Sequence, residues 1–275
     1  MTDDATFLSR IADQTRLDIA RRRAALPQPE LERRCAAARP RPGAGSHPFY
    51  RALRLRDGHP RIIAELKRAS PSKGPIRLDL DLADVAQDYE RQGAAAISVL
   101  TEEHFFRGSL DVLRAVRQRV RLPLLRKDFI LDDYQLFEAV DAGADAVLLI
   151  AALLTDDDTL AHFLRRAHEL GLETLCEAHT EAEVQRLLAL NADIIGVNCR
   201  DLTTFTLHPE RSEQLLAQLP ADCATVAESG IASPDDLRQF PSADAFLIGE
   251  TLMRHGDPGD NLRRFTASPH REARR

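Results

Sequence analysis

The sequence places an acid and a base, Glu65 and Lys67, at the end of a short apolar run, and a loop of Ser, Pro, Lys and Gly follows them at once. Residues i and i+2 of a strand share a face, so this carboxylate and this ammonium would point the same way. Burying such a pair in a core carries a large desolvation penalty. We therefore predict that this strand end faces a polar ligand rather than filling a core.

Ionisable or amide side chains also follow four later apolar runs. Each alone has an ordinary structural role, such as a capping carboxylate or a snorkelling lysine, but five strands that all end this way indicate one shared site. In such a site a lysine beside a carboxylate stays protonated and can donate a proton, and a carboxylate that is less well paired can act as a base. The four later sets are Lys127, Glu177, Asn198 with Arg200, and Glu228.

Small and hydroxyl residues follow the last two apolar runs. Ser229-Gly230 and Gly249 stand where barrels of parallel strands commonly hold phosphate, with backbone N–H groups of a helix N-terminus as donors. Either motif alone is weak evidence, since turns use these residues constantly. Together they favour a phosphorylated substrate.

The apolar runs that must position these side chains recur along the sequence with the spacing of βα units. Each apolar run is nearly continuous, as is typical of parallel strands buried on both faces. Eight alternating units predict a (β/α)8 barrel, with its active site at the carboxyl ends of the strands. A doubly wound open sheet is the alternative, but it usually has a Gly-rich fingerprint after its first strand, where this chain has Ser-Pro-Ser-Lys-Gly. The predicted strands are Arg61–Leu66, Ala95–Leu100, Leu122–Arg126, Ala144–Ile150, Glu173–Cys176, Asp193–Val197, Ala224–Ala227 and Ala243–Ile248.

Capping residues and glycines mark the helices between these strands. Three of the predicted helices close on a glycine just before the next strand begins. The predicted helices are Leu82–Gln92, Leu110–Arg119, Asp132–Ala142, Asp156–Leu170, Glu181–Leu190, Glu210–Leu219, one that starts at Ser233-Pro234, and a last one from Glu250–Arg254 onward.

Residues 1–60 precede the first strand, and we expect them to form a helical extension packed on the barrel. A weak helical stripe comprises Phe7, Leu8, Ile11 and Leu17. The basic runs at residues 21–23 and 33–34 are diluted by nearby acids, which indicates a solvated helix face rather than a nucleic-acid patch. We expect the barrel to cover residues 61–265 and a frayed tail to cover residues 266–275.

The composition argues against several classes of function. The chain of 275 residues has a net charge of −6 and no Trp, which gives no reason to expect nucleic-acid or membrane binding. Its four cysteines are scattered without the spacing of zinc ligands, so we expect a reducing, cytoplasmic setting and neither a metal nor a cofactor. A closed barrel exposes no sheet edge, which favours a monomer.

The residues at the strand ends resemble one family. Residues 63–74 read Ile-Ala-Glu-Leu-Lys-Arg-Ala-Ser-Pro-Ser-Lys-Gly, which closely resembles the signature of indole-3-glycerol-phosphate synthases, enzymes of tryptophan biosynthesis. The resemblance runs from about residue 4 to residue 265. The other matching segments, in order, are Ser98–Glu102, Phe106–Ser109, Leu125–Phe129, Glu177, Asn198–Leu202, Ala227–Ile231 and Phe246–Gly249.

The resemblance implies a carboxy-lyase reaction. The substrate would be 1-(2-carboxyphenylamino)-1-deoxyribulose 5-phosphate, and the pyrrole ring of indole would close with release of CO2 and water. The family pattern makes Lys127 the acid on the ketose carbonyl and Glu177 the candidate base, with Glu65 as another. Lys67 would either bind the substrate carboxylate or act as the acid in the dehydration.

The same resemblance assigns binding roles. Asn198 and Glu228 would orient groups in a polar network, and Arg200 would bind an anionic substrate group or pair with an acid. Apolar walls for the anthranilate ring would come from Phe106 and Phe129, although core packing accounts for these two nearly as well. The phosphate would be held by Ser70, Ser229, Gly230 and Gly249.

Two features depart from the family pattern. Some relatives carry a small hydroxyl residue at the position of Glu250, so we expect only a backbone contact with phosphate there. Cys176 and Cys199 follow no family pattern, and strand alternation points Cys176 away from the pocket.

Two alternative functions remain open. One is another phosphate-binding barrel, such as a phosphoribosylanthranilate isomerase with a Cys/Asp acid–base pair, and the other is a barrel subunit without catalytic activity. Glu65 and Lys67 on the first strand argue against the isomerase. The presence of Lys127 and Glu177 argues against the inactive subunit.

Overall fold

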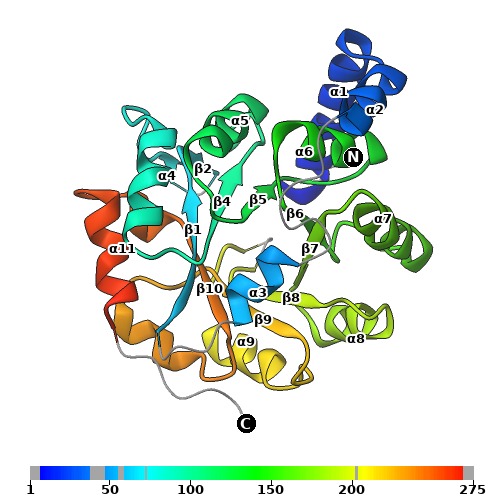
Figure 1. The fold of residues 1–275 in the computed structure, drawn as a ribbon. Coiled ribbons are helices and arrows are strands. Elements are labelled where there is room, and N and C mark those ends of the chain that lie inside the picture. The colour runs from blue at the N-terminus through cyan, green and yellow to red at the C-terminus, as the bar shows by residue number, and fades with distance from the viewer. Residues whose placement is uncertain (1–6, 38–46, 55–58, 72, 202–203, 269–275) are drawn as a thin grey trace, which may run out of the picture.

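The computed structural model describes residues 7–37, 47–54, 59–71, 73–201 and 204–268. Eight parallel strands close into a barrel in the order β1-β10-β9-β8-β7-β6-β5-β4, and helices alternate with them around the outside (Figure 1). This confirms the (β/α)8 barrel and excludes the open doubly wound sheet. The barrel strands are β1 (Arg61–Leu66), β4 (Ala96–Leu100), β5 (Leu124–Lys127), β6 (Ala146–Ile150), β7 (Glu173–Ala178), β8 (Ile194–Asn198), β9 (Ala224–Glu228) and β10 (Ala245–Ile248).

The strands alternate between two apolar environments, as buried parallel strands do. On β1, Ile62 and Ala64 pack among the surrounding helices, while Ile63 belongs to the cluster inside the barrel. Glu65 continues the inward face of Ile63 toward the carboxyl end of the strand, because side chains alternate with a period of two. The same alternation places Cys176 in the outer cluster, so its predicted orientation away from the barrel interior is confirmed.

The strand register places the carboxyl ends of neighbouring strands side by side at one end of the barrel. Asn198 pairs with Glu228 across β8 and β9, and Glu177 pairs with Ile150 across β7 and β6. The predicted third strand ends at Arg126, whereas β5 continues through Lys127, so this lysine is the last residue of its strand.

Polar side chains cap most of the outer helices. Asp132 accepts the backbone N–H of Tyr134 at the start of α6, and Gly143 ends that helix with a left-handed φ of 95°. The segment after Ser233 is a 3-10 helix rather than the expected α-helix, and the last predicted helix divides into two. The outer helices are α4 (Leu82–Arg91), α5 (Leu110–Arg119), α6 (Asp133–Ala142), α7 (Asp157–Glu169), α8 (Glu181–Ala189), α9 (Pro209–Leu216), η1 (Pro234–Gln239), α10 (Glu250–Met253) and α11 (Pro258–Thr266).

Three helices precede the barrel: α1 (Phe7–Ala25), α2 (Gln28–Ala37) and α3 (Pro48–Arg54). Figure 1 shows α1 and α2 beside α6, where Ile19 of α1 packs with Tyr134 of α6. Phe49 and Leu53 of α3 instead join the cluster inside the barrel and close its amino-terminal end.

Two details of the amino-terminal extension differ from the simple picture of an apolar stripe and a solvated basic face. Leu17, the last residue of the stripe, is 66% exposed, because the buried face of α1 runs through Ile11 and Ile19. The basic run predicts that Arg22 is solvated, but its guanidinium pairs with the buried Glu138 of α6 at 2.6 Å. A helix packed against a charged surface buries arginines that are matched by acids there.

The loop after β1 contains a small hairpin that was not predicted, formed by β2 (Ala69–Ser70) and β3 (Gly74–Pro75). Ser72 of the signature motif and Leu202 of the later motif lie outside the described residues. Most of the predicted tail, residues 269–275, also lies outside them, while Thr266 is the last residue of α11.

Candidate active site

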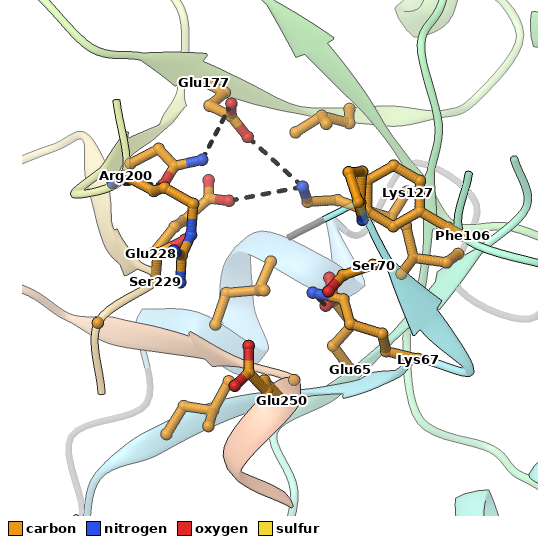
Figure 2. Close-up of a pocket in the computed structure, with 18 of the residues that line it drawn as sticks. Glu65, Lys67, Ser70, Phe106, Lys127, Glu177, Arg200, Glu228, Ser229 and Glu250 are labelled. Atoms are coloured by element: carbon orange, nitrogen blue, oxygen red, sulfur yellow. Dashed lines mark hydrogen bonds and ion pairs between the residues drawn. The ribbon is translucent and has the colours of Figure 1, made fainter. Parts of the chain in front are cut away.

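A cavity of about 370 Å³ opens at the carboxyl ends of the barrel strands, and Figure 2 shows part of its lining. All thirteen residues predicted for the site line this cavity. They come from the ends of the strands and the loops that follow them, as the fold requires of an active site. The thirteen are Glu65, Lys67, Ser70, Phe106, Lys127, Phe129, Glu177, Asn198, Arg200, Glu228, Ser229, Gly230 and Gly249. The structure thus brings every one of them together, while their individual roles stay predictions.

Lys127 points between two buried carboxylates (Figure 2). Its Nζ lies 3.5 Å from Glu177 Oε2 and 3.8 Å from Glu228 Oε2. Burial alone would lower the pKa of this ammonium, but the charges of Glu177, Glu228 and Glu65 outweigh burial and raise the pKa above its ordinary value. The lysine therefore holds its proton at neutral pH, as a general acid must.

Glu177 is fixed from several sides. Asn198 Nδ2 donates to Glu177 Oε1 at 3.3 Å, and the other carboxylate oxygen faces Lys127. Burial would raise the pKa of Glu177, but Lys127 and then His179 and the Asn198 amide outweigh it and hold the pKa below its usual value. Glu177 is therefore an ionised carboxylate, suited to accept a proton.

Glu228 differs from Glu177 in its environment. Burial, followed by the negative charge of Glu177, raises the pKa of Glu228 well above its usual value, and the nearby Lys127 offsets this only in part. Glu228 Oε1 makes no hydrogen bond among the described residues and lies against Gly196, where a Cβ would come within 2.1 Å of it. The pKa values of the two carboxyl groups beside this lysine are thus shifted in opposite directions, an arrangement typical of acid–base sites.

Glu65 and Lys67 form an ion pair on one side of the cavity, with Lys67 Nζ 2.6 Å from Glu65 Oε1. The shared face expected for positions i and i+2 is thus present at the end of β1. Gly249 makes room for this pair, because a Cβ at that position would lie 2.2 Å from Glu65 Oε1. Gly249 is predicted as a phosphate residue, and its small size has this second structural reason.

The predicted phosphate residues line one part of the cavity wall. Ser229 and Gly230 both have left-handed backbones, with φ of 66° and 77°. Such a conformation is unusual for Ser and is concentrated at functional sites. The Ser70 hydroxyl is buried and makes no hydrogen bond among the described residues, so it is available to a ligand. Glu250 pairs with Arg254 one helical turn further on, which partly neutralises its charge beside this wall.

The apolar wall holds both predicted aromatic residues and three that were not predicted. The rings of Phe106 and Phe129 lie 6.1 Å apart and both line the cavity. Phe7, Leu8 and Ile11 of α1 also line it, so the amino-terminal extension contributes to the site. Nothing near these residues in the sequence marks them as cavity-lining, because their place follows from the docking of α1 on the barrel.

His179 is a further residue that the sequence analysis missed. It follows Glu177 by two residues at the end of β7, and its Nε2 lies 3.5 Å from Glu177 Oε1. The spacing that links Glu65 to Lys67 also links Glu177 to His179, so the sequence did contain a signal for it. Its ring borders a smaller cavity of about 260 Å³ that Asn198 also lines.

A buried cation supports the strand end that carries Lys127. Arg126 is fully buried and pairs with Asp128 at 2.9 Å and with Glu138 at 3.2 Å. Burial would raise the pKa of Asp128, but Arg126, together with the Thr101 hydroxyl, lowers it below its usual value. The charged residues on either side of Lys127 thus pair with one another and with α6, and they hold the end of β5 in place.

The sequence contains three lysines, Lys67, Lys73 and Lys127, and all three line the cavity. Cationic side chains elsewhere in the chain are arginines or histidines. An ammonium can exchange its proton during a reaction, whereas a guanidinium does not. The distribution therefore fits a cavity in which protons are transferred.

Within the described part of the chain, no group of three or more His, Cys, Asp or Glu side chains is arranged to hold a metal ion. The four cysteines are free thiols, and none of them is among the described residues that line the main cavity. No helix among the residues placed by the structure has the length and apolar character needed to cross a membrane.

Comparison with known sequences identifies one family. The chain matches the family model of indole-3-glycerol phosphate synthase over residues 8–265. It is 46% identical over 267 residues to the indole-3-glycerol phosphate synthase of a Nocardioides species, covering 95% of this chain and 98% of that protein. The enzymes of the same name from Campylobacter jejuni and Micrococcus luteus are 43% and 46% identical, with 94% and 96% of this chain and 98% of each relative covered.

Solved structures of more distant proteins share the fold alone. A 3-hexulose-6-phosphate synthase from Salmonella typhimurium superposes with a TM-score of 0.61 at 17% identity, covering 75% of this chain and 97% of that one. A thiamine phosphate pyrophosphorylase from Pyrococcus furiosus gives a TM-score of 0.56 at 16% identity, covering 77% of this chain and 95% of that one.

Proposed function

Since the chain belongs to the indole-3-glycerol phosphate synthase family, we propose that the cavity at the carboxyl end of its barrel carries out that reaction with the residues that line it. The reaction is a carboxy-lyase step of tryptophan biosynthesis. It closes the indole ring of a carboxyphenylamino deoxyribulose phosphate and releases CO2 and water. Its steps need an anion site, an apolar surface, an acid and a base, and this chain has residues for each.

The substrate is proposed to lie across the cavity with its phosphate at Ser70, Ser229, Gly230 and Gly249. The free hydroxyl of Ser70 and the left-handed turn at Ser229 support this placement. The anthranilate ring would then lie against Phe106 and Phe129. This orientation leaves the sugar carbons between the two ends, where Lys127 and Glu177 face the cavity.

Ring closure needs an acid on the ketose carbonyl oxygen, because a ring carbon attacks that carbonyl and negative charge develops on the oxygen. Lys127 is proposed as this acid. Two carboxyl groups flank its ammonium at 3.5 and 3.8 Å and keep it protonated until the carbonyl oxygen takes the proton. This placement of Lys127 between Glu177 and Glu228 is the observation that carries the proposal.

Loss of CO2 then restores part of the aromaticity of the ring. Dehydration must next remove the hydroxyl formed from the ketose carbonyl, with an acid at that oxygen and a base at a neighbouring proton. Glu177 is proposed as the base, because its pKa is held low and its carboxylate borders the cavity. Glu65 is tied to Lys67 at 2.6 Å, which makes it the less available base.

Two roles are open to Lys67. As a ligand of the substrate carboxylate, its loss would raise KM, whereas as the acid of the dehydration its loss would lower kcat. Arg200 is likewise proposed as a ligand for an anionic group of the substrate, since it lines the cavity and, among the described residues, its Nη1 donates a long hydrogen bond of 3.3 Å to the Phe205 carbonyl. Lys67→Met and Arg200→Met kinetics, with KM and kcat measured separately, decide these assignments.

The test of the function is direct. The purified chain should convert the carboxyphenylamino deoxyribulose phosphate to a fluorescent indole product, and Lys127→Ala and Glu177→Gln should each abolish most of that signal. An inactive wild-type chain, or activity on the isomerase substrate phosphoribosylanthranilate instead, would overturn the proposal. No cysteine is among the described residues of the cavity lining, which favours the synthase over that isomerase.

We also propose that the chain works as a monomer in the cytoplasm on a free small molecule. The closure of the eight described barrel strands, each paired on both sides, supports the monomer. Light scattering of the purified protein at the concentration used for kinetics tests it, and a mass of two or more chains would contradict it.

A further inference from the structure

Glu177 contacts positive or hydrogen-donating groups through both of its oxygens. Lys127 faces Oε2 at 3.5 Å, and the imidazole of His179 faces Oε1 at 3.5 Å. The proposed reaction uses Lys127 and Glu177 but gives no part to His179. An imidazole this close to a catalytic carboxylate must affect the charge and the orientation of that carboxylate.

The surroundings of His179 favour its charged form. The side chain is only 13% exposed, and neither ring nitrogen makes a regular hydrogen bond within the part of the chain described here. A second carboxylate, Glu183 of α8, lies 3.8 Å from Nδ1 and also accepts the backbone N–H of His179 at 2.6 Å. A ring between two carboxylates is attracted to both when it carries a proton.

The charged groups around the ring come from several elements. Burial lowers the pKa of His179, but Glu183 and Glu177 outweigh burial and raise the pKa above its ordinary value, with Lys127 opposing them. The neighbouring smaller cavity adds further polar groups that face this region from the loop after β8 and from α9, namely Asp201, His208 and Arg211. The nearest charges to the ring are therefore negative, and they belong to β7 and α8.

We propose that His179 is a positioning residue for Glu177, whose imidazolium holds Oε1 of the carboxylate so that Oε2 stays directed toward Lys127 and the substrate. The inference rests on the proposed role of Glu177 as the base. A carboxylate held at one oxygen by an amide and an imidazolium keeps one rotamer, and a fixed base transfers protons more efficiently than a mobile one. The imidazolium also keeps the carboxylate ionised.

Two substitutions of His179 test the proposal. His179→Gln keeps a hydrogen-bond donor without charge, and His179→Phe keeps a planar ring without donor or charge. We expect the single-turnover rate to fall about tenfold or more in His179→Phe and less in His179→Gln, with KM little changed. In both variants the acidic limb of the pH–rate profile should move to higher pH by about one unit. The reason is that an opposite charge at this distance lowers the pKa of a carboxyl group by about that much or more, and both variants remove this charge.

Matched controls separate this effect from local damage. His208→Gln changes a histidine that borders the same smaller cavity, is exposed, and pairs with Thr206 rather than with Glu177, so its rate profile should match wild type. Glu183→Gln removes the second partner of the ring and should lower the pKa of His179. NMR titration of the imidazole reads that pKa directly, without any assay of activity.

The outcomes distinguish the two proposals. If Glu177→Gln retains normal turnover, the role of Glu177 as base is wrong and the inference about His179 is overturned with it. If Glu177→Gln is inactive but both His179 variants keep the wild-type rate and acidic limb, only the inference is overturned. Should His179→Phe fail to fold, the NMR titration still decides. A wild-type imidazole that titrates at or below about pH 6.5, unchanged by Glu177→Gln, would contradict the proposed contact.

Discussion

Gly196 lies directly against Glu228, so that a Cβ at position 196 would come within 2.1 Å of Glu228 Oε1. Because Gly196 on β8 has no side chain, it leaves a space that the carboxyl group of Glu228 on the neighbouring β9 occupies. The same relationship recurs between Gly249, which follows β10, and Glu65 of the adjacent β1. These two glycines therefore leave the space that two acidic side chains of the cavity occupy.

Gly196→Ala should displace the carboxyl of Glu228. We expect a loss of stability of about 1–3 kcal/mol from overpacking and a fall in kcat, measured by urea denaturation and steady-state kinetics. The matched control is the double variant with Glu228→Ala. If the clash with Glu228 is the cause, adding Gly196→Ala to that background should cost much less stability than it costs in wild type. An equal cost in both backgrounds would assign the effect to Leu175, whose Cδ1 would lie 3.2 Å from the new Cβ.

Lys127→Ala should lower turnover by at least about 100-fold, the lower end of what general acids contribute. Lys127→Met should do the same while keeping most of the alkyl stem, so that an empty volume in the cavity cannot account for the loss. Circular dichroism should show an intact fold in both variants, because Lys127 faces the cavity rather than the core. Near-normal turnover in either variant would remove Lys127 from the mechanism.

Glu228→Gln tests the protonation of Glu228. The pKa of this buried group is raised, so the folded state binds its proton more tightly than the unfolded chain does. The associated stability is fully present below the unfolded value of about 4.3 and is lost as pH rises through the folded pKa. The glutamine has no charge to lose, so we expect the variant to gain stability relative to wild type as pH rises from about 4 toward 8. A stability difference that does not depend on pH would show that the pKa of Glu228 is not raised by the fold.

Ser70→Ala should weaken binding more than chemistry. A hydrogen bond to a charged group contributes roughly 1.5–3 kcal/mol, so the loss of this hydroxyl should raise KM by about tenfold or more with a smaller change in kcat. Inorganic phosphate should inhibit the wild type competitively and the variant less strongly. An unchanged KM, or a liganded crystal with the phosphate away from Ser70 and Ser229, would contradict the assignment.

Arg126→Met should destabilise the fold by about 3–5 kcal/mol, because it leaves a buried carboxylate without its cation. This is Asp128, at 2.9 Å from the guanidinium, whereas Glu138, at 3.2 Å, keeps its ion pair with Arg22. The pKa of Asp128 is lowered in the fold, so its contribution to stability is present above the unfolded value of about 3.9 and is lost as pH falls through the folded pKa. Urea denaturation at about pH 7 and about pH 3 should therefore show a smaller difference between variant and wild type at the lower pH. Equal differences at both values would contradict this account.

The fold could be predicted from the sequence because each barrel strand is a continuous apolar segment buried on both sides. The strand ends could be predicted as well, since a polar side chain that terminates such a segment contributes little to the core and most often faces the cavity. Boundaries were less accurate, as the extension of β5 to Lys127 illustrates. Helix ends such as Gly143 could be predicted, because a glycine readily adopts the left-handed backbone conformation and this preference does not depend on distant contacts.

The missed features depend on contacts between distant segments. Phe7 lies at the cavity because α1 packs on barrel residues that are distant from it in the sequence. Leu17 is exposed because this packing buries another face of the helix. A weak apolar stripe does not specify which side of the helix will be buried, because this depends on the surface against which the helix packs. His179 is a different case, because its two-residue spacing from Glu177 equals the spacing between Glu65 and Lys67, so the sequence does mark it.

The confinement of every lysine to the cavity has a practical consequence for handling the protein. Reagents that couple to ε-amines, such as succinimidyl esters or aldehyde resins, find no such group on the outer helices. A dye or support that does react at an ε-amine should therefore impair the enzyme, and bound substrate should protect these lysines. Attachment through an ε-amine that preserves turnover will need a lysine introduced on an outer helix.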